Sequence, residues 1–306
     1  MKKYKILEDN SIKFRGKTLY RIQALIDFAD VKSGDVGGYI ESEKNLSHGG
    51  EAWVYNDAKV LDDAKVYNNA KVSENAVVFD CAKISSCAKV FGNAGISGNS
   101  EVYDYAEIFG DANILGLAKA FNCAKIHGKA KVYGRSKIHG YAEIYDDADV
   151  YGDIEVCGSA RVYGSAWLFG YTKICGKAKI HGNAQVYGRT KILDAEVYGG
   201  AQIYDNAVVF GEAKIFGKAY VCGNSEIYGD AQVSSYEDYI VFKNNWSSGR
   251  HFTYTRSNKM WKAGCFYGTS EELVEKAYED SELSGKNYSL YVELVKNLEK
   301  NLESNN

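Results

Sequence analysis

The sequence predicts an all-β protein whose body is a parallel β-helix, and three observations support this. Residues 52–235 repeat a unit of six residues, as in AKIHGK AKVYGR SKIHGY from Ala124 onward. A small residue, usually Ala, and a Val or Ile lie two positions apart in each unit, so both point to the same side of a strand. A Gly or Asp and then a polar residue usually end the unit, and such pairs turn the chain through positive φ. The chain contains 31 glycines and no proline.

The Val/Ile position sets the length of the repeat. It recurs once per unit from Val54 to Ile192, resumes one residue early at Val197 and continues to Val233. The early step arises because the segment 192–195 is one residue short. β-Branched side chains favour strands, so we expect 31 units, three to a triangular coil. About ten coils at ~4.8 Å each give a rod of roughly 50 Å.

The repeat resembles the hexapeptide repeat of left-handed parallel β-helix proteins, in which an aliphatic residue is followed four positions later by a small one. The left hand is implied by this resemblance, since periodicity does not fix it. The segments GDVGGYIESEKNLS, before the coils, and WSSGRHFTYTR and GCFYGTSEEL, after them, resemble the hexapeptide-repeat proteins of bacteriophages and prophages. Such proteins are often labelled transferases from the repeat alone, which is an analogy from fold.

Two other segments flank the repeat. Residues 1–51 contain the candidate strands YKIL, SIKFRG and TLYRIQAL, with a hairpin turn expected at Glu8-Asp9-Asn10. We expect them to form an N-terminal β cap that protects the edge of the first coil.

Residues 236–306 predict a small C-terminal α+β cap. Its expected strands are DYIVFK, HFTYTR and KMWKAG, and Thr269-Ser270-Glu271-Glu272 is a capping box for a helix that ends near Asp280. A second helix is expected from about Tyr288 to Leu302. As an alternative to a plain cap, neighbouring basic and aromatic residues in this segment suggest a site for an anion: Trp246, Arg250, His251, Arg256, Trp261 and Lys262.

Three units per coil place every third unit above the one before it, which defines three outer faces. The mixed-charge face carries Lys71, Lys89, Glu107, Lys125, Glu143, Arg161, Lys179 and Glu196. The basic face carries Lys65, Lys83, Glu101, Lys119, Lys137, Glu155, Lys173 and Lys191. The aromatic face carries Lys59, Val77, Gly95, Asn113, Lys131, Asp149, Trp167, Gln185, Gln202 and Tyr220, together with Leu61, Phe79, Ser97, Leu115, Tyr133, Tyr151, Phe169, Tyr187, Tyr204 and Cys222.

The aromatic face has few charges and many rings, which would leave a large apolar patch exposed on a monomer. We therefore expect a homo-oligomer in which a second copy covers this face around Trp167, Phe169, Tyr187 and Tyr204. The resembled fold implies a trimer. The alternative is that the outward rings merely stack on one another along their own coils.

Bulk properties exclude some functions and leave others open. A net charge of −3 gives no basic field for double-stranded nucleic acid. No stretch approaches the ~20 apolar residues of a membrane span, and MKKYKILEDN lacks the apolar run of a signal peptide. We expect a cytoplasmic protein, in the host cytoplasm if a phage encodes it. The cysteines are therefore expected to be reduced thiols, including Cys157 and Cys175, because adjacent parallel strands offer poor disulfide geometry: Cys81, Cys87, Cys123, Cys157, Cys175, Cys222 and Cys265.

One internal duplication provides the candidate site. Residues 125–138, KIHGKAKVYGRSKI, recur at 179–192 as KIHGNAQVYGRTKI, with 11 of 14 positions identical. The two copies are offset by nine units, which is three full coils, so the two histidines share a face and the two arginines share a corner. Recent duplication alone explains this. Alternatively, these side chains bind a phosphate and stack a base. The candidate ligand-binding residues are Lys125, His127, Arg135, His139, Arg161, Tyr163, Trp167, Lys179, His181, Arg189, Arg250 and Arg256.

The leading hypothesis is a non-enzymatic, oligomeric protein that holds a small anion such as a nucleotide, for example to sequester a host immune signal. The resemblance also implies an acyltransferase that uses acetyl-CoA, with His127 and His181 as catalytic candidates, and a structural spacer is the third alternative. The three histidines His127, His139 and His181 occupy positions that usually hold Tyr or Phe, so each is either a further ring or a functional group. No metal-ligand spacing, Ser/His/Asp set, P-loop or dinucleotide fingerprint is present, so no other cofactor and no metal are expected.

Overall fold

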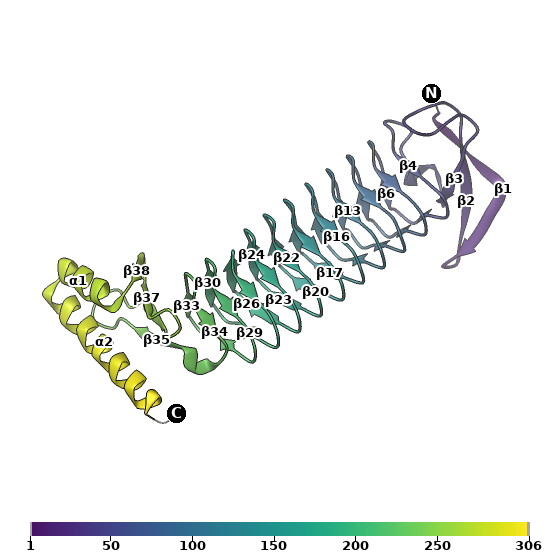
Figure 1. The fold of residues 1–306 in the computed structure, drawn as a ribbon. Coiled ribbons are helices and arrows are strands. Elements are labelled where there is room, and N and C mark those ends of the chain that lie inside the picture. The colour runs from purple at the N-terminus through teal and green to yellow at the C-terminus, as the bar shows by residue number, and fades with distance from the viewer. Residues whose placement is uncertain (1, 305–306) are drawn as a thin grey trace.

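The computed structural model describes residues 2–304 and shows a long, straight solenoid with a different cap at each end. Two antiparallel strands lie at the N-terminal end, and two helices packed beside a small sheet lie at the C-terminal end (Figure 1). Short strands between them wind into stacked triangular coils. The expected parallel β-helix with two caps is confirmed.

The three outer faces are three parallel sheets. The mixed-charge face consists of β4 (Trp53–Val54), β7 (Lys71–Val72), β10 (Lys89–Val90), β13 (Glu107–Ile108), β16 (Lys125–Ile126), β19 (Glu143–Ile144), β22 (Arg161–Val162), β25 (Lys179–Ile180), β28 (Glu196–Val197), β31 (Lys214–Ile215) and β34 (Gln232–Val233). The basic face consists of β6 (Lys65–Val66), β9 (Lys83–Ile84), β12 (Glu101–Val102), β15 (Lys119–Ala120), β18 (Lys137–Ile138), β21 (Glu155–Val156), β24 (Lys173–Cys175), β27 (Lys191–Leu193), β30 (Val208–Phe210) and β33 (Glu226–Ile227). The aromatic face consists of β5 (Lys59–Val60), β8 (Val77–Val78), β11 (Gly95–Ile96), β14 (Asn113–Ile114), β17 (Lys131–Gly134), β20 (Asp149–Gly152), β23 (Trp167–Gly170), β26 (Gln185–Gly188), β29 (Gln202–Ile203) and β32 (Tyr220–Val221).

The aliphatic and small residues of each unit fill the interior, as the alternation predicts. Ile126, Val132 and Ile138, from the three strands of one coil, are fully buried, and so is Ala130 between them. These side chains belong to one continuous apolar core that runs the length of the solenoid. Burial of such aliphatic side chains is the main favourable term in folding.

The corners explain the glycines of the repeat. Gly182 has φ +67°, and a Cβ added there would lie 3.0 Å from the backbone nitrogen of Gly199 in the next coil. Stacked corners therefore approach too closely for most side chains, and the left-handed conformation favours Gly, Asn and Asp.

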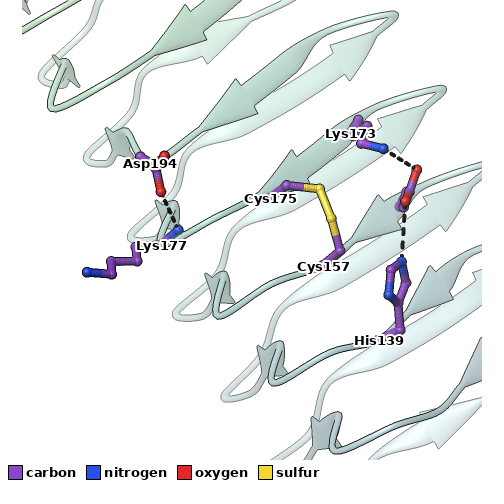
Figure 2. The surroundings of a disulfide bond; sticks show 7 residues. His139, Cys157, Lys173, Cys175, Lys177 and Asp194 are labelled. Carbon is purple, nitrogen blue, oxygen red and sulfur yellow. Dashed lines mark hydrogen bonds and ion pairs between the residues drawn. A yellow bond between two sulfur atoms is a disulfide. The ribbon is translucent and has the colours of Figure 1, made fainter.

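The one-residue deletion is absorbed at a corner. Lys179 pairs with Glu196, and Glu196 pairs in turn with Lys214, so the first of these two coils is one residue shorter than the second. The carboxylate of Asp194 accepts a hydrogen bond of 2.8 Å from the backbone N–H of Lys177 (Figure 2). At the same corner one coil earlier, the backbone N–H of Ser159 donates to the carbonyl oxygen of Gly176 instead. The Asp194 side chain thus replaces a backbone acceptor.

The coil stack begins before the hexads do. β3 (Val36–Ile40) pairs in parallel with β5, and Leu46 forms a parallel bridge with Val66. A short 3₁₀ turn (Glu43–Asn45) lies between them. Residues 36–54 therefore complete one coil more than the repeat alone indicates. The repeat does not indicate this coil because its residues do not follow the six-residue spacing.

The N-terminal hairpin differs from its expected form. β1 (Tyr4–Phe14) pairs with β2 (Lys17–Ala24) in antiparallel fashion, and β2 pairs with β3. The expected turn at Glu8-Asp9-Asn10 is wrong, because these residues form an irregularity within β1, where the register shifts between Leu7 and Ser11. The turn lies at Arg15-Gly16, whose φ values of +48° and +77° make a left-handed turn that Gly permits.

The C-terminal unit contains a four-stranded antiparallel sheet and two helices. The strands are β35 (Tyr239–Lys243), β36 (His251–Thr255), β37 (Met260–Ala263) and β38 (Phe266–Gly268), after a 3₁₀ turn (Tyr236–Asp238). The capping box at Thr269 opens α1 (Ser270–Asp280), as predicted. The helix α2 (Glu282–Glu303) begins earlier than expected, because Ser281 caps it by accepting a hydrogen bond from the backbone N–H of Ser284. Neither helix has the length and apolarity that would let it cross a membrane.

Outside the paired strand residues, most hydrogen bonds between coils run in one direction, which leaves different groups in excess at the two ends. The backbone N–H of Lys125 donates to the carbonyl oxygen of Ala142 in the next coil, at 2.9 Å, and this pattern recurs along the solenoid. The first coil is therefore left mainly with unpaired carbonyl oxygens and the last coil mainly with unpaired N–H groups. Buried groups of this kind must find partners.

The N-terminal cap supplies hydrogen-bond donors. The Lys3 ammonium donates to the carbonyl oxygen of Ala52 at 2.7 Å, and the Tyr4 hydroxyl donates to that of Leu46 at 2.8 Å. Burial lowers the pKa of Lys3 to about 8, against the opposing effect of Glu51. This buried ammonium is tolerated because it satisfies exposed carbonyl groups.

The C-terminal cap supplies hydrogen-bond acceptors. The hydroxyl groups of Tyr239, Thr253 and Ser257 accept hydrogen bonds from backbone N–H groups of the last coil. The donors are Cys222 on the aromatic face, Glu226 on the basic face and Gln232 on the mixed-charge face, at 3.3, 2.9 and 2.7 Å respectively. One hydroxyl group thus caps each of the three sheets.

We predict that Tyr239→Phe destabilises the protein by about 1–3 kcal/mol, because the Cys222 N–H loses its acceptor. Tyr239 also donates to the carbonyl oxygen of Tyr220 at 3.0 Å. Burial raises the pKa of Tyr239 from 10.0 to about 12, so its contribution is complete below pH 10 and is lost as pH rises from 10 to 12. Thermal unfolding followed by circular dichroism should show the difference between parent and variant shrinking over that range. A constant difference would contradict the prediction.

Candidate functional site

The structure distributes the predicted site residues over three faces, one corner and the C-terminal cap. Lys125, His127, Arg161, Tyr163, Lys179 and His181 lie on the mixed-charge face, as their strands require. His139 follows β18 on the basic face, and Trp167 begins β23 on the aromatic face. Arg135 and Arg189 lie at the corner between the aromatic and basic faces. The twelve residues therefore do not form one site.

His127 and His181 belong to a stack of parallel rings that runs up the mixed-charge face. Neighbouring ring centres are 4.6–5.4 Å apart and the ring planes are nearly parallel; the stack comprises Phe91, Phe109, His127, Tyr145, Tyr163, His181, Tyr198 and Phe216. His139 has the same role in a shorter stack on Phe121, at 4.8 Å. All three histidines therefore occupy the place of an aromatic ring.

Each of these histidines also contacts a carboxylate in the next coil. The Nε2 atoms of His127, His139 and His181 lie 3.2, 3.3 and 3.3 Å from the nearest carboxylate oxygens of Glu143, Glu155 and Glu196. The same imidazole–carboxylate geometry thus recurs three times, on two faces. This periodicity follows from the repeat, and it does not single out one histidine as a catalytic base.

The cations of the mixed-charge face also contact carboxylates. Lys125 lies 3.7 Å from Glu107, Arg161 lies 3.4 Å from Glu143, and Lys179 lies 3.9 Å from Glu196. Such exposed pairs contribute little stability, but their carboxylates offset most of the positive charge that would attract an anion to this face. The mixed-charge face is therefore a weak candidate for the ligand site.

The corner between the aromatic and basic faces has a different shape. Along the aromatic face, the strands β17, β20, β23 and β26 are longer than the other solenoid strands of that face. A surface groove of about 310 Å³ lies beside them, and its lining is Gly134, Arg135, Tyr151, Gly152, Asp153, Phe169, Gly170 and Tyr171. We call this the corner groove.

The inner residues of these coils account for the altered corner. The inner position after the turn is usually a buried Ala, but here it is Ser136, Ile154, Thr172 and Thr190, all buried. Larger inner side chains need a wider turn, and Gly152 and Gly170 accordingly have φ values of +118° and +94°, outside the usual left-handed range near +57°. The corner is thus wider where the inward-pointing residue that follows the turn is larger than alanine.

Two arginines flank the corner groove in different electrostatic states. Arg135 forms a forked ion pair with Asp153 at 2.6 and 2.9 Å. Within residues 2–304, Arg189 forms no ion pair, and its guanidinium carbon lies 5.9 Å from the centre of the Tyr171 ring. Tyr171 is 61% exposed. A free guanidinium beside an exposed ring is suited to bind a planar anion.

Sequence reasoning identified the arginines of this corner but not the rest of the groove. Asp153 and Tyr171 were missed, although they lie in the same column as Arg135, one and two coils further along. The departure from Ala at positions 136, 154, 172 and 190 was the signal that could have located the corner.

Several rings of the aromatic face are exposed. Tyr151, Trp167 and Phe169 are each about 40% exposed, and Trp167 stacks on Phe169 within β23 at 5.7 Å. Tyr187 stacks on Tyr204 at 5.1 Å. Tyr151 and Phe169 line the corner groove, and Trp167 stacks on Phe169, so that the apolar surface and the groove are continuous.

The basic and aromatic residues of the C-terminal cap do not all converge, although Arg250 and His251 line one small pocket. Arg250 and Arg256 lie at opposite ends of β36. Trp261 is fully buried in the core of the cap and donates a hydrogen bond to the Ser270 hydroxyl at 3.0 Å. Lys262 points to the last coil, where it lies 3.7 Å from Glu226. Trp261 thus packs the core of the cap, and Lys262 helps to attach the cap to the solenoid.

Cys157 and Cys175 form a disulfide bond, so the prediction that both are free thiols is wrong (Figure 2). They follow paired residues of β21 and β24 on the basic face, and their Cα atoms are 4.6 Å apart. That separation lies within the range that a disulfide accepts, so the spacing of adjacent coils does not prevent the bond. The five other cysteines, all among the described residues, are free.

His139 and Glu155 lie next to this disulfide. Figure 2 shows the His139 ring below Cys157 in the same column of side chains. Burial alone would raise the pKa of Glu155, but hydrogen bonds from Lys173 and His139 outweigh this effect and lower the pKa below its ordinary value. The carboxylate therefore stays ionised at neutral pH.

Comparison with known proteins adds one match. The family model described as the YdcK beta-solenoid repeat matches residues 201–213. These residues span the strands β29 and β30 and the corner that follows each of them. Together with the coils, the match identifies a β-helix repeat protein. A comparison with curated proteins finds no match.

We predict that His127→Tyr changes the free energy of unfolding by less than about 1 kcal/mol, because a tyrosine ring fits the stack. His127→Ala should cost more, since it removes ring contacts on both sides. Thermal unfolding of the two variants tests this directly. If the tyrosine variant were as unstable as the alanine variant, the histidine would have a role beyond that of a stacked ring.

Proposed function

We propose that this protein is a non-enzymatic, oligomeric binding protein that holds a small planar anion, of the nucleotide class, in the corner groove. One observation carries the proposal: the guanidinium of Arg189 forms no ion pair within the described residues and lies beside the exposed ring of Tyr171. Every other arginine or lysine proposed on the solenoid faces contacts a carboxylate.

The groove supplies the contacts that such a ligand needs. Tyr151, Phe169 and Tyr171 provide faces on which a base could stack. Arg189 would bind a phosphate group by charge-assisted hydrogen bonds, and Lys173 and Lys191 begin the next strands beyond the corner. The ion pair of Arg135 and Asp153 would hold one side of the corner groove in place.

The second part of the proposal is self-association through the aromatic face. The exposed rings of Trp167 and Phe169 would leave an apolar surface in water, and a second copy of the chain would cover it. Because these rings border the groove, association would also close one side of the ligand site. The resemblance to left-handed β-helix proteins supports a trimer.

The resemblance to phage-encoded repeat proteins supports a specific setting. In the host cytoplasm, a protein that binds a signalling nucleotide without converting it would lower the free concentration of that nucleotide. The mass-action effect depends on affinity and protein concentration alone. No observation on the described residues favours the acyltransferase or the spacer.

We predict that Arg189→Ala weakens the binding of 5′-AMP by about 10–100-fold, because one charge-assisted contact is worth about 1.5–3 kcal/mol. Isothermal titration calorimetry with 5′-AMP, and with inorganic phosphate for comparison, measures this. Arg161→Ala is the matched control, because Arg161 is an exposed arginine that contacts Glu143 on another face. No binding of 5′-AMP by the parent, or equal loss in both variants, would refute the corner groove as the site.

We predict that Trp167→Glu reduces the mass of the particle to that of one chain, because it places a charge in the proposed interface. Native mass spectrometry and sedimentation measure the mass. Tyr141→Glu serves as the control, since Tyr141 is 73% exposed and lies at a different corner. A monomeric parent protein would refute the association.

A further inference from the structure

We propose that the reduced protein has a Zn²⁺ site formed by His139, Glu155 and Cys157, and that the Cys157–Cys175 disulfide closes this site. The proposal is independent of the corner groove, since these residues lie on the basic face. Their ligand atoms all lie within 4.8 Å of one another. The sequence does not reveal this set by local spacing, because His139 and the other two members belong to different coils and meet only when the coils stack.

The geometry of the donor atoms suits a tetrahedral ion. Ligand atoms bound to one zinc ion lie about 3.3–3.8 Å apart, given Zn–N and Zn–O distances near 2.1 Å and Zn–S near 2.3 Å. His139 Nε2 and Glu155 Oε1 are already 3.3 Å apart. The Cys157 sulfur therefore needs to move by about 1 Å or less once it is released from Cys175.

The chemistry of the donors also suits zinc. Imidazole nitrogen, carboxylate oxygen and thiolate sulfur are its usual ligands, and three protein ligands leave a fourth position for solvent. Lys173 lies 3.0 Å from the other oxygen of Glu155, so Oε1, which faces His139, can bind the metal without breaking the ion pair with the lysine. One carboxylate and one thiolate neutralise the two charges of the ion.

The chain contains two internal controls. His127 with Glu143 and His181 with Glu196 repeat the imidazole–carboxylate contact at 3.2 and 3.3 Å. The residues that follow these histidines in their columns are Tyr145 and Tyr198, which stack on them. Only at His139 is the next residue of the column a cysteine. The proposal thus depends on the cysteine and not on the repeated pair.

The oxidation state of Cys157 and Cys175 would control the binding of Zn²⁺. Two equivalents of a cellular thiol, or one dithiol, reduce the disulfide, giving the Cys157 and Cys175 thiols and the oxidised reductant. Zn²⁺ then displaces the proton of the Cys157 thiol and binds the thiolate. Conversely, oxidation removes one of the three ligands and releases the ion. His139 and Glu155 are partly exposed, so ions and reductants have access.

Metal titration of the full-length protein tests the site. The parent protein is treated with a metal-free phosphine reductant and titrated with Zn²⁺ against a chromophoric chelator, and in parallel with Co²⁺. We expect one ion per chain and a thiolate-to-cobalt charge-transfer absorption band. Without reductant, the parent should bind at least about 100-fold more weakly, as should His139→Ala with reductant, because each lacks one ligand. The control His127→Ala should bind within about twofold of the parent.

Two serine variants separate the metal site from the disulfide. Both Cys157→Ser and Cys175→Ser abolish the disulfide, but only the first removes a ligand. Cys175→Ser should bind Zn²⁺ with or without reductant, and Cys157→Ser should bind it in neither condition. Zinc binding by Cys157→Ser equal to that of the parent, or no stoichiometric binding by the reduced parent, would overturn the proposal. Binding by the parent that is indifferent to reductant would also overturn it.

Discussion

The backbone hydrogen bonds between coils are the constraint on which the rest of the structure depends. Backbone N–H groups of one coil donate to carbonyl oxygens of the next along the whole solenoid, so that residues one coil apart in sequence become lateral neighbours. Side chains that repeat in sequence must therefore stack in space. The ring stack of the mixed-charge face, the histidine–glutamate contacts and the cross-coil disulfide all result from this one spacing. The caps differ for the same reason, since the first coil presents mainly free carbonyl oxygens and the last coil mainly free N–H groups.

Much of this architecture could be predicted from sequence, because the repeat encodes it directly. Alternation within the hexad identified which side chains fill the interior, and the interval of three hexads assigned the outward side chains to faces. The turn at Arg15-Gly16 and the first coil could not be predicted in this way, since residues 1–51 do not follow the period. The hand of the coil also lay beyond the period, because inward and outward positions alternate identically in either hand.

The candidate sites were harder to predict, and the reason is physical. Residues one coil apart stack in a column along the solenoid. The sequence predicts which residues are neighbours in such a column, but not which of them are already engaged in an ion pair or a ring stack. His127 and His181 looked notable as residue types, yet stacking and a carboxylate contact engage both. Arg189 differs only because its column contains Tyr171 where a carboxylate would otherwise pair with it. Cys157 and Cys175 were misjudged because parallel strand pairing was taken to exclude a disulfide that the coil spacing permits.

The short segment around Asp194 has a consequence for how such a solenoid changes over evolution. Its side chain supplies the acceptor that a missing backbone carbonyl would have provided, and the three sheets continue with their inward residues in place. A corner can therefore lose a residue without shifting the strands that follow it, whereas a loss within a strand would exchange the interior and exterior side chains. Viable insertions and deletions in this lineage should accordingly collect at the vertices of the triangle. Inserted loops, and any new ligand specificity that they provide, should also be tolerated at these three corners.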